Sequence, residues 1–156
     1  MGLVDTLHGS KVCIDTAPFI YYIEKDPKYL DIIKPIFTGV DTGQIDAITS
    51  TVTLLEVLVV PFRRNDLSLV EQYRDILLYS EGLRTFEIFH AVSELSSKLR
   101  AKYSIRTPDA IQIAVGITYG ADFFLTNDSN LKKVEDIHVL VLEDYLDSNP
   151  PSGDIG

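Results

Sequence analysis

Four acidic residues lie where the surrounding sequence is strongly apolar. Asp15 ends the segment KVCID, Glu56 interrupts TLLEVLVV, Asp109 opens DAIQIAVGI and Asp128 follows FFLT. A buried carboxylate without a partner costs several kcal/mol, so each needs a cation, a hydrogen-bond network or a shifted pKa. Hard divalent cations such as Mg²⁺ and Mn²⁺ prefer oxygen ligands, and they can activate water and orient a phosphate. These residue types therefore point to metal-dependent phosphodiester chemistry.

Each of the four acids also has a purely structural explanation. Asp15 can cap the helix that follows it, and Asp128 can cap the turn at 129–131. Asp109 lies in the first turn of a predicted helix, where negative charge is favourable in any case. Glu56 is the hardest to explain structurally, because nothing in a helix interior requires a lone Glu among Leu and Val.

The elements that must position these acids alternate along the chain. Short apolar runs predict strands at 11–15, 46–50, 86–89, 123–126 and 138–142. Helical spacing and Pro or Gly boundaries predict helices at 18–23, 28–38, 51–60, 67–79, 91–103 and 107–119. We therefore expect an α/β fold, a three-layer α/β/α sandwich with a central, mostly parallel sheet of about five strands.

This architecture predicts where the acids meet. In an open α/β sheet the carboxyl ends of the strands converge on one crevice, and that crevice is where ligands bind. Asp15 and Asp128 both follow predicted strands, Glu56 lies about one and a half turns into a helix, and Asp109 lies in a first turn. All four side chains can therefore face one pocket.

Length and composition limit the class of protein. The 156 residues fit a single domain at 1–146, and the tail 147–156 is expected to be disordered. Cys13 is the only cysteine, which excludes an intrachain disulfide, and the histidines lack zinc-ligand spacing. We find no secretion signal and no apolar run of about 18 residues that would span a membrane, so the expected location is cytoplasmic.

The charge distribution is uneven. A net charge of −9 argues against broad electrostatic attraction to nucleic acid. Eight of the 14 basic residues nevertheless fall in three groups, which are Arg63–Arg64, 98–106 and Lys132–Lys133. Such groups can hold phosphates beside an acidic pocket, although a solvated face is their commoner role. Arg106, just before the helix that carries Asp109, is the best single candidate for RNA binding, with Arg63 and Arg64 next.

Four segments, IDTAPFIYYIE, STVTLLEVL, RTPDAIQIA and FFLTND, together resemble a PIN domain, the family that includes the VapC-like toxins. The resemblance covers about residues 11–142, and it rests on the order and spacing of motifs that are individually weak. The acids of the family pattern fall on Asp15, Glu56, Asp109 and Asp128. The resemblance implies an endoribonuclease that uses Mg²⁺ or Mn²⁺, is commonly a homodimer, and is often a toxin with an antitoxin as partner.

The resemblance also implies roles for individual residues. Asp15 and Asp109 would be the main metal ligands, and Glu56 would complete the site directly or through water. Asp128 would bind a second metal ion or orient the other ligands. Thr126 matches a hydroxyl residue of the family that is expected to hydrogen-bond Asp15. Beside these, Gln112 lies one turn after Asp109 and is expected to support the ligands from behind.

Other classes of protein fit less well. A haloacid-dehalogenase phosphatase needs a second Asp two residues after the first, where this chain has Ala17. The paired acids and the lysine of a receiver domain are not clear, and there is no P-loop or GxGxxG motif. A catalytically silent PIN-like binding or regulatory module stays open, although the presence of all four acids argues against it. A DNA-directed nuclease also stays open, because its metal chemistry would be the same.

Overall fold

The centre of the protein is a five-stranded parallel sheet with the strand order β3-β2-β1-β4-β5. The structure is a computed structural model, and it describes residues 2–146. The strands are β1 (Lys11–Ile14), β2 (Asp46–Ser50), β3 (Leu83–Phe86), β4 (Phe123–Thr126) and β5 (His138–Val141). The chain winds outward from β1 to β3 and then returns to the other side of β1 with β4, so the topological switch point lies between β1 and β4.

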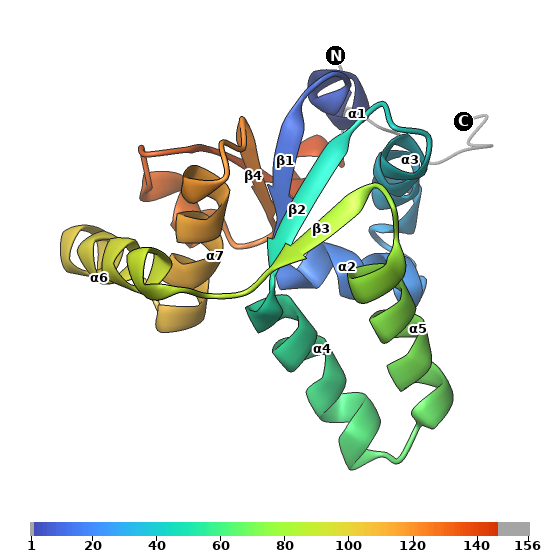
Figure 1. Cartoon of the computed structure of the whole chain (residues 1–156). Helices are drawn as coiled ribbons and strands as arrows, with labels where there is room; N and C mark the ends of the chain where they lie inside the picture. The colour runs from blue at the N-terminus through green and yellow to red at the C-terminus, as the bar shows by residue number, and fades with distance from the viewer. Residues whose placement is uncertain (1, 147–156) are drawn as a thin grey trace.

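Helices cover both faces of this sheet, which confirms the three-layer α/β/α prediction (Figure 1). One layer contains α1 (Leu3–Leu7), α2 (Thr16–Ile23), α3 (Leu30–Asp41) and α5 (Leu67–Tyr79). The other contains α6 (His90–Tyr103), α7 (Thr107–Thr118) and the 3-10 helix η1 (Ser129–Lys133), and a second 3-10 helix, η2 (Leu142–Tyr145), follows β5. The remaining helix, α4 (Thr51–Arg63), pairs with α5 in a hairpin that projects beyond the carboxyl edge of the sheet.

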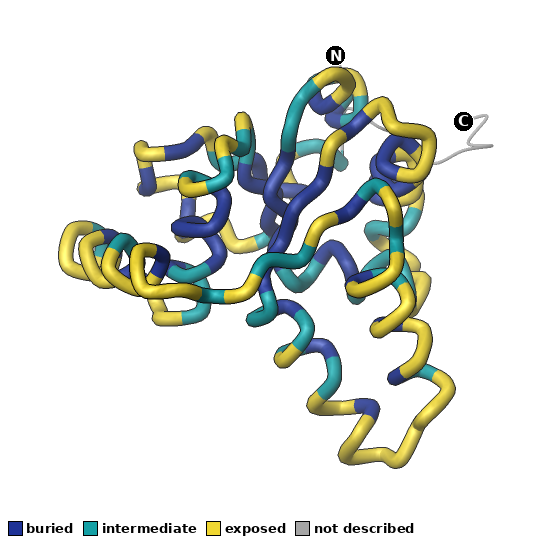
Figure 2. The backbone as a smooth tube through the Cα atoms, viewed as in Figure 1, coloured by how far each residue is buried: buried dark blue, intermediate teal, exposed yellow. Residues whose placement is uncertain are grey.

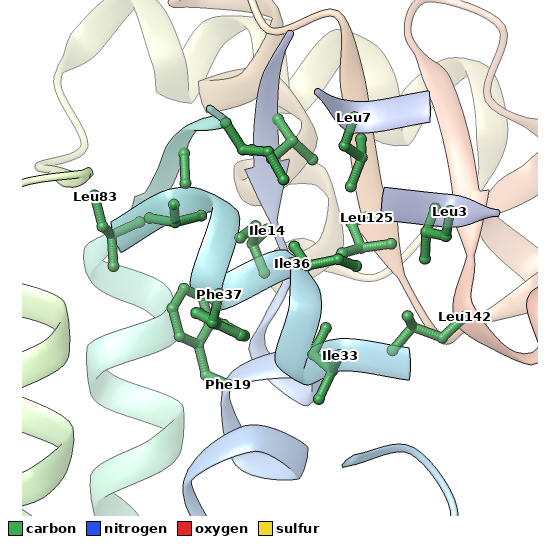
Figure 3. Close-up of a cluster of buried hydrophobic side chains, with 14 of the residues drawn as sticks. Leu3, Leu7, Ile14, Phe19, Ile33, Ile36, Phe37, Leu83, Leu125 and Leu142 are labelled. Atoms are coloured by element: carbon green, nitrogen blue, oxygen red, sulfur yellow. The ribbon is translucent and has the colours of Figure 1, made fainter. Parts of the chain in front are cut away.

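Two hydrophobic cores follow from the alternation of side chains along the strands. In β1, Val12 and Ile14 enter the core under α1–α3, shown in Figure 3, whereas Cys13 enters the core under α6 and α7. In β4, Leu125 and Phe124 divide in the same way. The middle of the sheet is therefore buried on both faces, as Figure 2 shows, and this explains why its strands read as continuous apolar runs.

The elements differ from the sequence predictions at several places. The third strand is Leu83–Phe86 and not 86–89, so that prediction was wrong. This strand lies at the edge of the sheet and only Leu83 is fully buried, so its apolar signal is weak. The helix predicted to stop at Val60 continues through Pro61 to Arg63. Proline lacks a backbone N–H and so removes one helical hydrogen bond, but Pro61 lies close to the end of the helix and little of the helix follows it. The short helix α1 was not predicted.

Two other predictions concern the ends of the chain and membranes. The tail 147–156, predicted to be disordered, lies outside the described residues. Within residues 2–146, no helix combines the length and apolar character that crossing a membrane requires.

Candidate active site

Asp15 lies at the centre of the carboxyl edge, directly after β1 and at the switch point of the sheet. It is the N-cap of α2, and its Oδ1 accepts a hydrogen bond from the Thr16 amide at 2.8 Å. Its Oδ2 accepts the Thr126 hydroxyl at 2.8 Å, so the hydrogen bond expected between these residues is present. Burial raises the pKa of Asp15, the two hydrogen bonds oppose this, and the charge of Glu56 adds to the increase.

Glu56 is half-buried on α4, and it leans toward the start of α2. Its Oε1 accepts the Thr16 hydroxyl at 2.6 Å. The helix α4 begins directly after β2, with the Ser50 hydroxyl accepting a hydrogen bond from the Val52 amide at 3.1 Å. Because β2 and β1 are neighbours in the sheet, this start brings the second turn of α4 next to Asp15. Within the described residues, no ion pair involves Glu56.

Gln112 links three of the surrounding elements. It is fully buried, and its Oε1 accepts the Ser50 hydroxyl at 2.6 Å. Its Nε2 donates to the hydroxyl of Thr53 at 2.5 Å and lies 3.5 Å from that of Thr16. Thr16 in turn holds Glu56, so Gln112 supports the acid through shared hydroxyl groups and does not contact it directly.

The hydroxyl groups of Thr16, Ser50 and Thr53 were not among the predicted site residues. They come from α2, β2 and α4, and a fourth hydroxyl, that of Thr49, bonds Thr53 at 2.8 Å. A cluster of Ser and Thr at 49–53 is visible in the sequence, but nothing in the sequence pairs it with Gln112. Among the described residues no buried side-chain N or O atom lacks a hydrogen-bond partner, so this network is complete.

Asp109 lies in the first turn of α7 and is partly buried. Burial is the largest cause that raises its pKa from 3.8 to about 6, and the negative charge of Asp15 is the next. Arg106 opposes the increase, and the charges of Asp128 and Glu56 add to it. The charges of Asp15, Glu56 and Asp128 therefore all act on Asp109.

Asp128 is the most exposed of the four acids. Its Oδ1 accepts the Asn130 amide at 2.9 Å and caps η1, so the structural explanation offered by the sequence holds for this residue. Its own amide donates to the Thr126 hydroxyl at 3.1 Å. Thr126 therefore connects Asp15 and Asp128 directly.

The chemistry of these donors fits a hard divalent cation. All four groups are carboxylates, and none takes part in an ion pair within residues 2–146. In the same part of the chain, however, no three His, Cys, Asp or Glu side chains are arranged to hold a metal ion as they stand. One oxygen of Glu56 accepts the Thr16 hydroxyl, and one oxygen of Asp128 accepts the Asn130 amide.

The basic candidates lie at two different distances from the acids. Arg106 is exposed, it precedes α7, and its charge acts on Asp109. Arg63 and Arg64 are exposed at the far end of the projecting hairpin. Because α4 leaves the edge of the sheet and rises about 1.5 Å per residue, Arg63 lies about 10 Å farther along the helix axis than Glu56. Arg63 and Arg64 therefore lie apart from the acids of their own chain.

An apolar groove of the described surface lies apart from the acidic site. A groove of about 560 Å³ lies between α2, α3 and α5, with Tyr22, Phe37 and Ile76 among its lining residues, and none of the four acids reaches it. Charged side chains, among them Lys25, Lys34 and Asp75, also line this groove. We place the chemistry at the acids because Asp15 lies at the switch point of the sheet, where ligands bind in folds of this kind.

Glu56→Gln is expected to remove most of the activity and to leave the fold intact. The change keeps the side-chain volume and a hydrogen-bond acceptor for Thr16, but it removes one negative charge from the site. A salt-bridge role would instead cost about 3–5 kcal/mol, because a buried partner would be stranded. The measurements are the melting temperature and the rate of the RNA cleavage that the sequence predicts. A clear drop in melting temperature with full activity would rule out a metal-site role.

The acids lie at the switch point of a parallel sheet that helices cover on both faces, which is where an α/β fold binds its ligands. The model of the PIN domain family matches residues 12–137, and the chain belongs to this family. Family membership supports a nuclease as the class of protein.

Solved structures with the same fold come from several bacteria. They include VapBC2 from Rickettsia felis bound to a DNA fragment from its promoter, with a TM-score of 0.67, 15% identity, and coverage of 84% of this chain and 98% of that one. A toxin–antitoxin complex from Klebsiella pneumoniae has a TM-score of 0.64, 18% identity and coverage of 85% and 98%. The sarcin-ricin loop cleaving toxin VapC20 from Mycobacterium tuberculosis has a TM-score of 0.60, 16% identity and coverage of 74% and 87%. At these identities the likeness establishes the fold. No curated protein matches the sequence.

Proposed function

We propose that this protein is an endoribonuclease that depends on Mg²⁺ or Mn²⁺. The observation that carries the proposal is the meeting of four carboxylates, supplied by four separate segments, at the switch point between β1 and β4. Within the described residues no ion pair involves them, and only the charge of Arg106 opposes the raised pKa of Asp109, so a divalent cation would be a suitable counter-charge. Membership of the PIN domain family supports nuclease chemistry, and RNA as the substrate follows from the resemblance of the four acidic motifs.

The roles of the residues follow from their positions. Asp15 and Asp109 are the main ligands, with Asp15 held in place by Thr126. Glu56 completes the ligand set, directly or through water, and the Thr16 hydroxyl that Gln112 supports orients it. Asp128 binds a second ion or orients the first. When bound, Mg²⁺ or Mn²⁺ supplies an activated water and neutralises charge on the phosphate, and the products are a 5′-phosphate and a 3′-hydroxyl.

A cleavage assay separates this function from its alternatives. The protein is incubated with mixed RNA and with single- and double-stranded DNA, in Mg²⁺, in Mn²⁺ and in EDTA. We expect RNA to be cut in either metal and to stay intact in EDTA. Cleavage of DNA alone would favour the DNA-directed nuclease. Binding of RNA without cleavage under every condition would favour the silent binding module.

Arg106→Ala is expected to weaken RNA binding and to reduce the dependence of log affinity on log salt by about one unit, because one phosphate contact is lost. The reason is its exposed position beside Asp109, where it can contact a phosphate entering the acidic site. Binding is measured with inactive protein at several salt concentrations. Lys34→Ala, an exposed cation on α3, is the matched control. An unchanged salt dependence for the Arg106 variant would show that Arg106 is a solvated surface residue and does not contact a phosphate.

A protein antitoxin is the proposed partner. The fold is shared with the toxin–antitoxin complex from Klebsiella pneumoniae, which supports the proposal at the level of architecture. Co-expression of this chain with the product of a small neighbouring reading frame tests it: a stable complex with suppressed cleavage is the expected result.

We also propose that the protein acts in the cytoplasm as a homodimer.

A further inference from the structure

A polar groove of about 320 Å³ lies between α6 and α7, two helices that pack side by side on one face of the sheet (Figure 1). It is lined by Ser93, Ser96, Ser97 and Arg100 of α6 and by Thr107 and Ile111 of α7. All but one of these side chains are polar, and none is acidic. The groove therefore suits a ligand that is polar or negatively charged.

Arg100 is held in a defined orientation at this groove. Its Nε donates a hydrogen bond to the carbonyl oxygen of Ile105, in the connection between α6 and α7, at 3.0 Å. Within residues 2–146 no ion pair involves Arg100, and the other N–H groups of its guanidinium donate to no protein group. A guanidinium that is fixed at one nitrogen and free at the others offers a planar fork of donors, which matches the oxygens of a phosphate.

Two hydroxyl groups of the groove are also free in the described part of the chain. Those of Ser96 and Ser97 donate to the helix carbonyls of Val92 and Glu94, whereas those of Ser93 and Thr107 have no partner there. A hydroxyl group both donates and accepts, as the 2′-hydroxyl of ribose does. The groove thus combines a donor for phosphate with groups that are suited to a ribose.

The charge around the groove favours a polyanion. Residues 91–107 contain four basic residues and only one acid, in a chain whose net charge is −9. One of the four, Lys102, pairs with Asp136 at 3.5 Å, and no ion pair within residues 2–146 involves the other three. Local positive charge of this kind concentrates phosphates at a surface even where the whole protein repels them.

The groove is continuous with the acidic site across the start of α7. Thr107 and Ile111 line the groove, and Asp109 lies two residues from each, so it faces the opposite side of the helix. Arg106, whose charge acts on Asp109, is the residue directly before Thr107. One helix thickness, about 10–12 Å, therefore separates the two sites. The end of a helix that they share is the end that favours negative charge.

We propose that this groove holds one nucleotide of the RNA strand that is cut, with Arg100 on its phosphate and the hydroxyl groups of Ser93 and Thr107 on its ribose. The strand runs from the acids over the start of α7 into the groove. The phosphate contact positions the strand, and the ribose contacts favour RNA over DNA. The choice of RNA as ligand rests on the proposed nuclease function, and Arg100 is a positioning residue that does not touch the phosphate that is cut.

Binding to single-stranded RNA of mixed sequence, measured in EDTA at several salt concentrations, tests the contact of Arg100. Arg100→Ala should weaken binding at least about tenfold and reduce the slope of log affinity against log salt by about 0.7. Arg100→Lys should keep the slope and recover only part of the affinity, because lysine keeps the charge without the fork. Lys98→Ala is the matched control, an exposed cation on the same helix that does not line the groove, and it should leave the slope unchanged.

Two results of this experiment would overturn the proposal. Equal effects of Arg100→Ala and Lys98→Ala would mean that RNA responds only to the overall charge of α6. A lower melting temperature of Arg100→Ala with an unchanged salt slope would mean that Arg100 serves only to hold the connection between α6 and α7.

A comparison of RNA with DNA of the same sequence tests the ribose contacts. Combining Ser93→Ala with Thr107→Val should weaken binding to RNA about two- to tenfold for each lost hydrogen bond and leave binding to DNA unchanged. Thr118→Val, which removes an exposed hydroxyl at the other end of α7, is the control and should keep the preference for RNA. Equal losses for RNA and DNA, or no loss for either, would contradict the ribose contacts.

Cleavage kinetics separate the groove from the proposed function. Arg100→Ala should raise KM for RNA about tenfold and leave kcat unchanged, because it removes binding that is equal in the ground state and the transition state. A lower kcat with an unchanged KM would contradict the positioning role. If the wild type cuts no RNA in Mg²⁺ or Mn²⁺, the proposed function fails, and the binding measurements in EDTA still decide whether the groove holds a strand.

Discussion

Asp15→Asn is expected to lower the rate of RNA cleavage by at least about a hundredfold in saturating Mn²⁺, because it removes the charge of a main metal ligand. Asp15 is the most buried of the four acids, and both of its oxygens are already oriented by Thr16 and Thr126. Asparagine keeps the volume and can still accept the Thr16 amide. The loss should therefore appear in the rate and in metal affinity, with the fold retained.

The comparison uses single-turnover cleavage of one RNA by the wild type and the variant. Asp31→Asn, on the exposed surface of α3, is the matched control for a lost negative charge and should cut at the wild-type rate. Asp109→Asn should behave like Asp15→Asn. Wild-type cleavage by either site variant would show that the residue is not a metal ligand.

The second large effect is on stability, and it comes from Asp109. Burial and the neighbouring carboxylates raise the pKa of Asp109 to about 6 in the folded protein, above its ordinary value of 3.8. Between these two values the folded state binds more protons than the unfolded state. Stability from this group is therefore fully present below pH 3.8 and is lost as the pH rises through about 6. Burial shifts the pKa of Asp15 in the same direction.

Asp109→Asn should therefore stabilise the metal-free protein at pH 7.5. Because solvent screens a partly buried carboxyl, we expect a gain of about 1–2 kcal/mol, and for a chain of this size a rise in melting temperature of about 3–6 °C. At pH 4 the difference between variant and wild type should nearly vanish, because the wild-type carboxyl is then mostly protonated in the fold.

With Mn²⁺ bound, the wild type should become more stable than the Asp109→Asn variant. At a hundred times its dissociation constant, Mn²⁺ stabilises the wild type by about 2.7 kcal/mol, whereas the variant has lost a ligand and should respond weakly. Thermal unfolding of both proteins, with and without Mn²⁺ at pH 7.5 and at pH 4, gives the full comparison. Identical melting curves for both proteins under all of these conditions would mean that the acids do not form one cation site.

Several elements could be predicted from the sequence with their observed limits. The strands at 46–50 and 123–126 and the helix at 67–79 agree with the structure because their signals are local, namely short apolar runs beside breakers and a clear helical period. The third strand could not be placed, because an edge strand buries little and the neighbouring FEIF is more apolar than LRTF. The end of the helix at Pro61 was also predicted wrongly, because the effect of a proline depends on how much of the helix follows it.

The four acids were visible in the sequence because a charge among apolar residues is a local contradiction that needs no structure to detect. Their support was not visible. Thr16, Ser50 and Gln112 come from three segments far apart in the chain, and only the packing of α7 on β2 and of α2 on α4 brings their polar groups within hydrogen-bonding distance. Hydrogen bonds act over about 3 Å, so tertiary structure alone decides which hydroxyl meets which amide.

The same distinction applies to the basic residues. The sequence placed Arg106 beside Asp109, and the structure agrees because three residues of chain leave little freedom. Arg63 and Arg64 follow Glu56 on the same helix two turns later, and α4 carries them away from the sheet to the tip of a hairpin. Residue type and spacing determined which functional groups the chain has. The direction in which each helix leaves the sheet determined which of these groups lie in the same site.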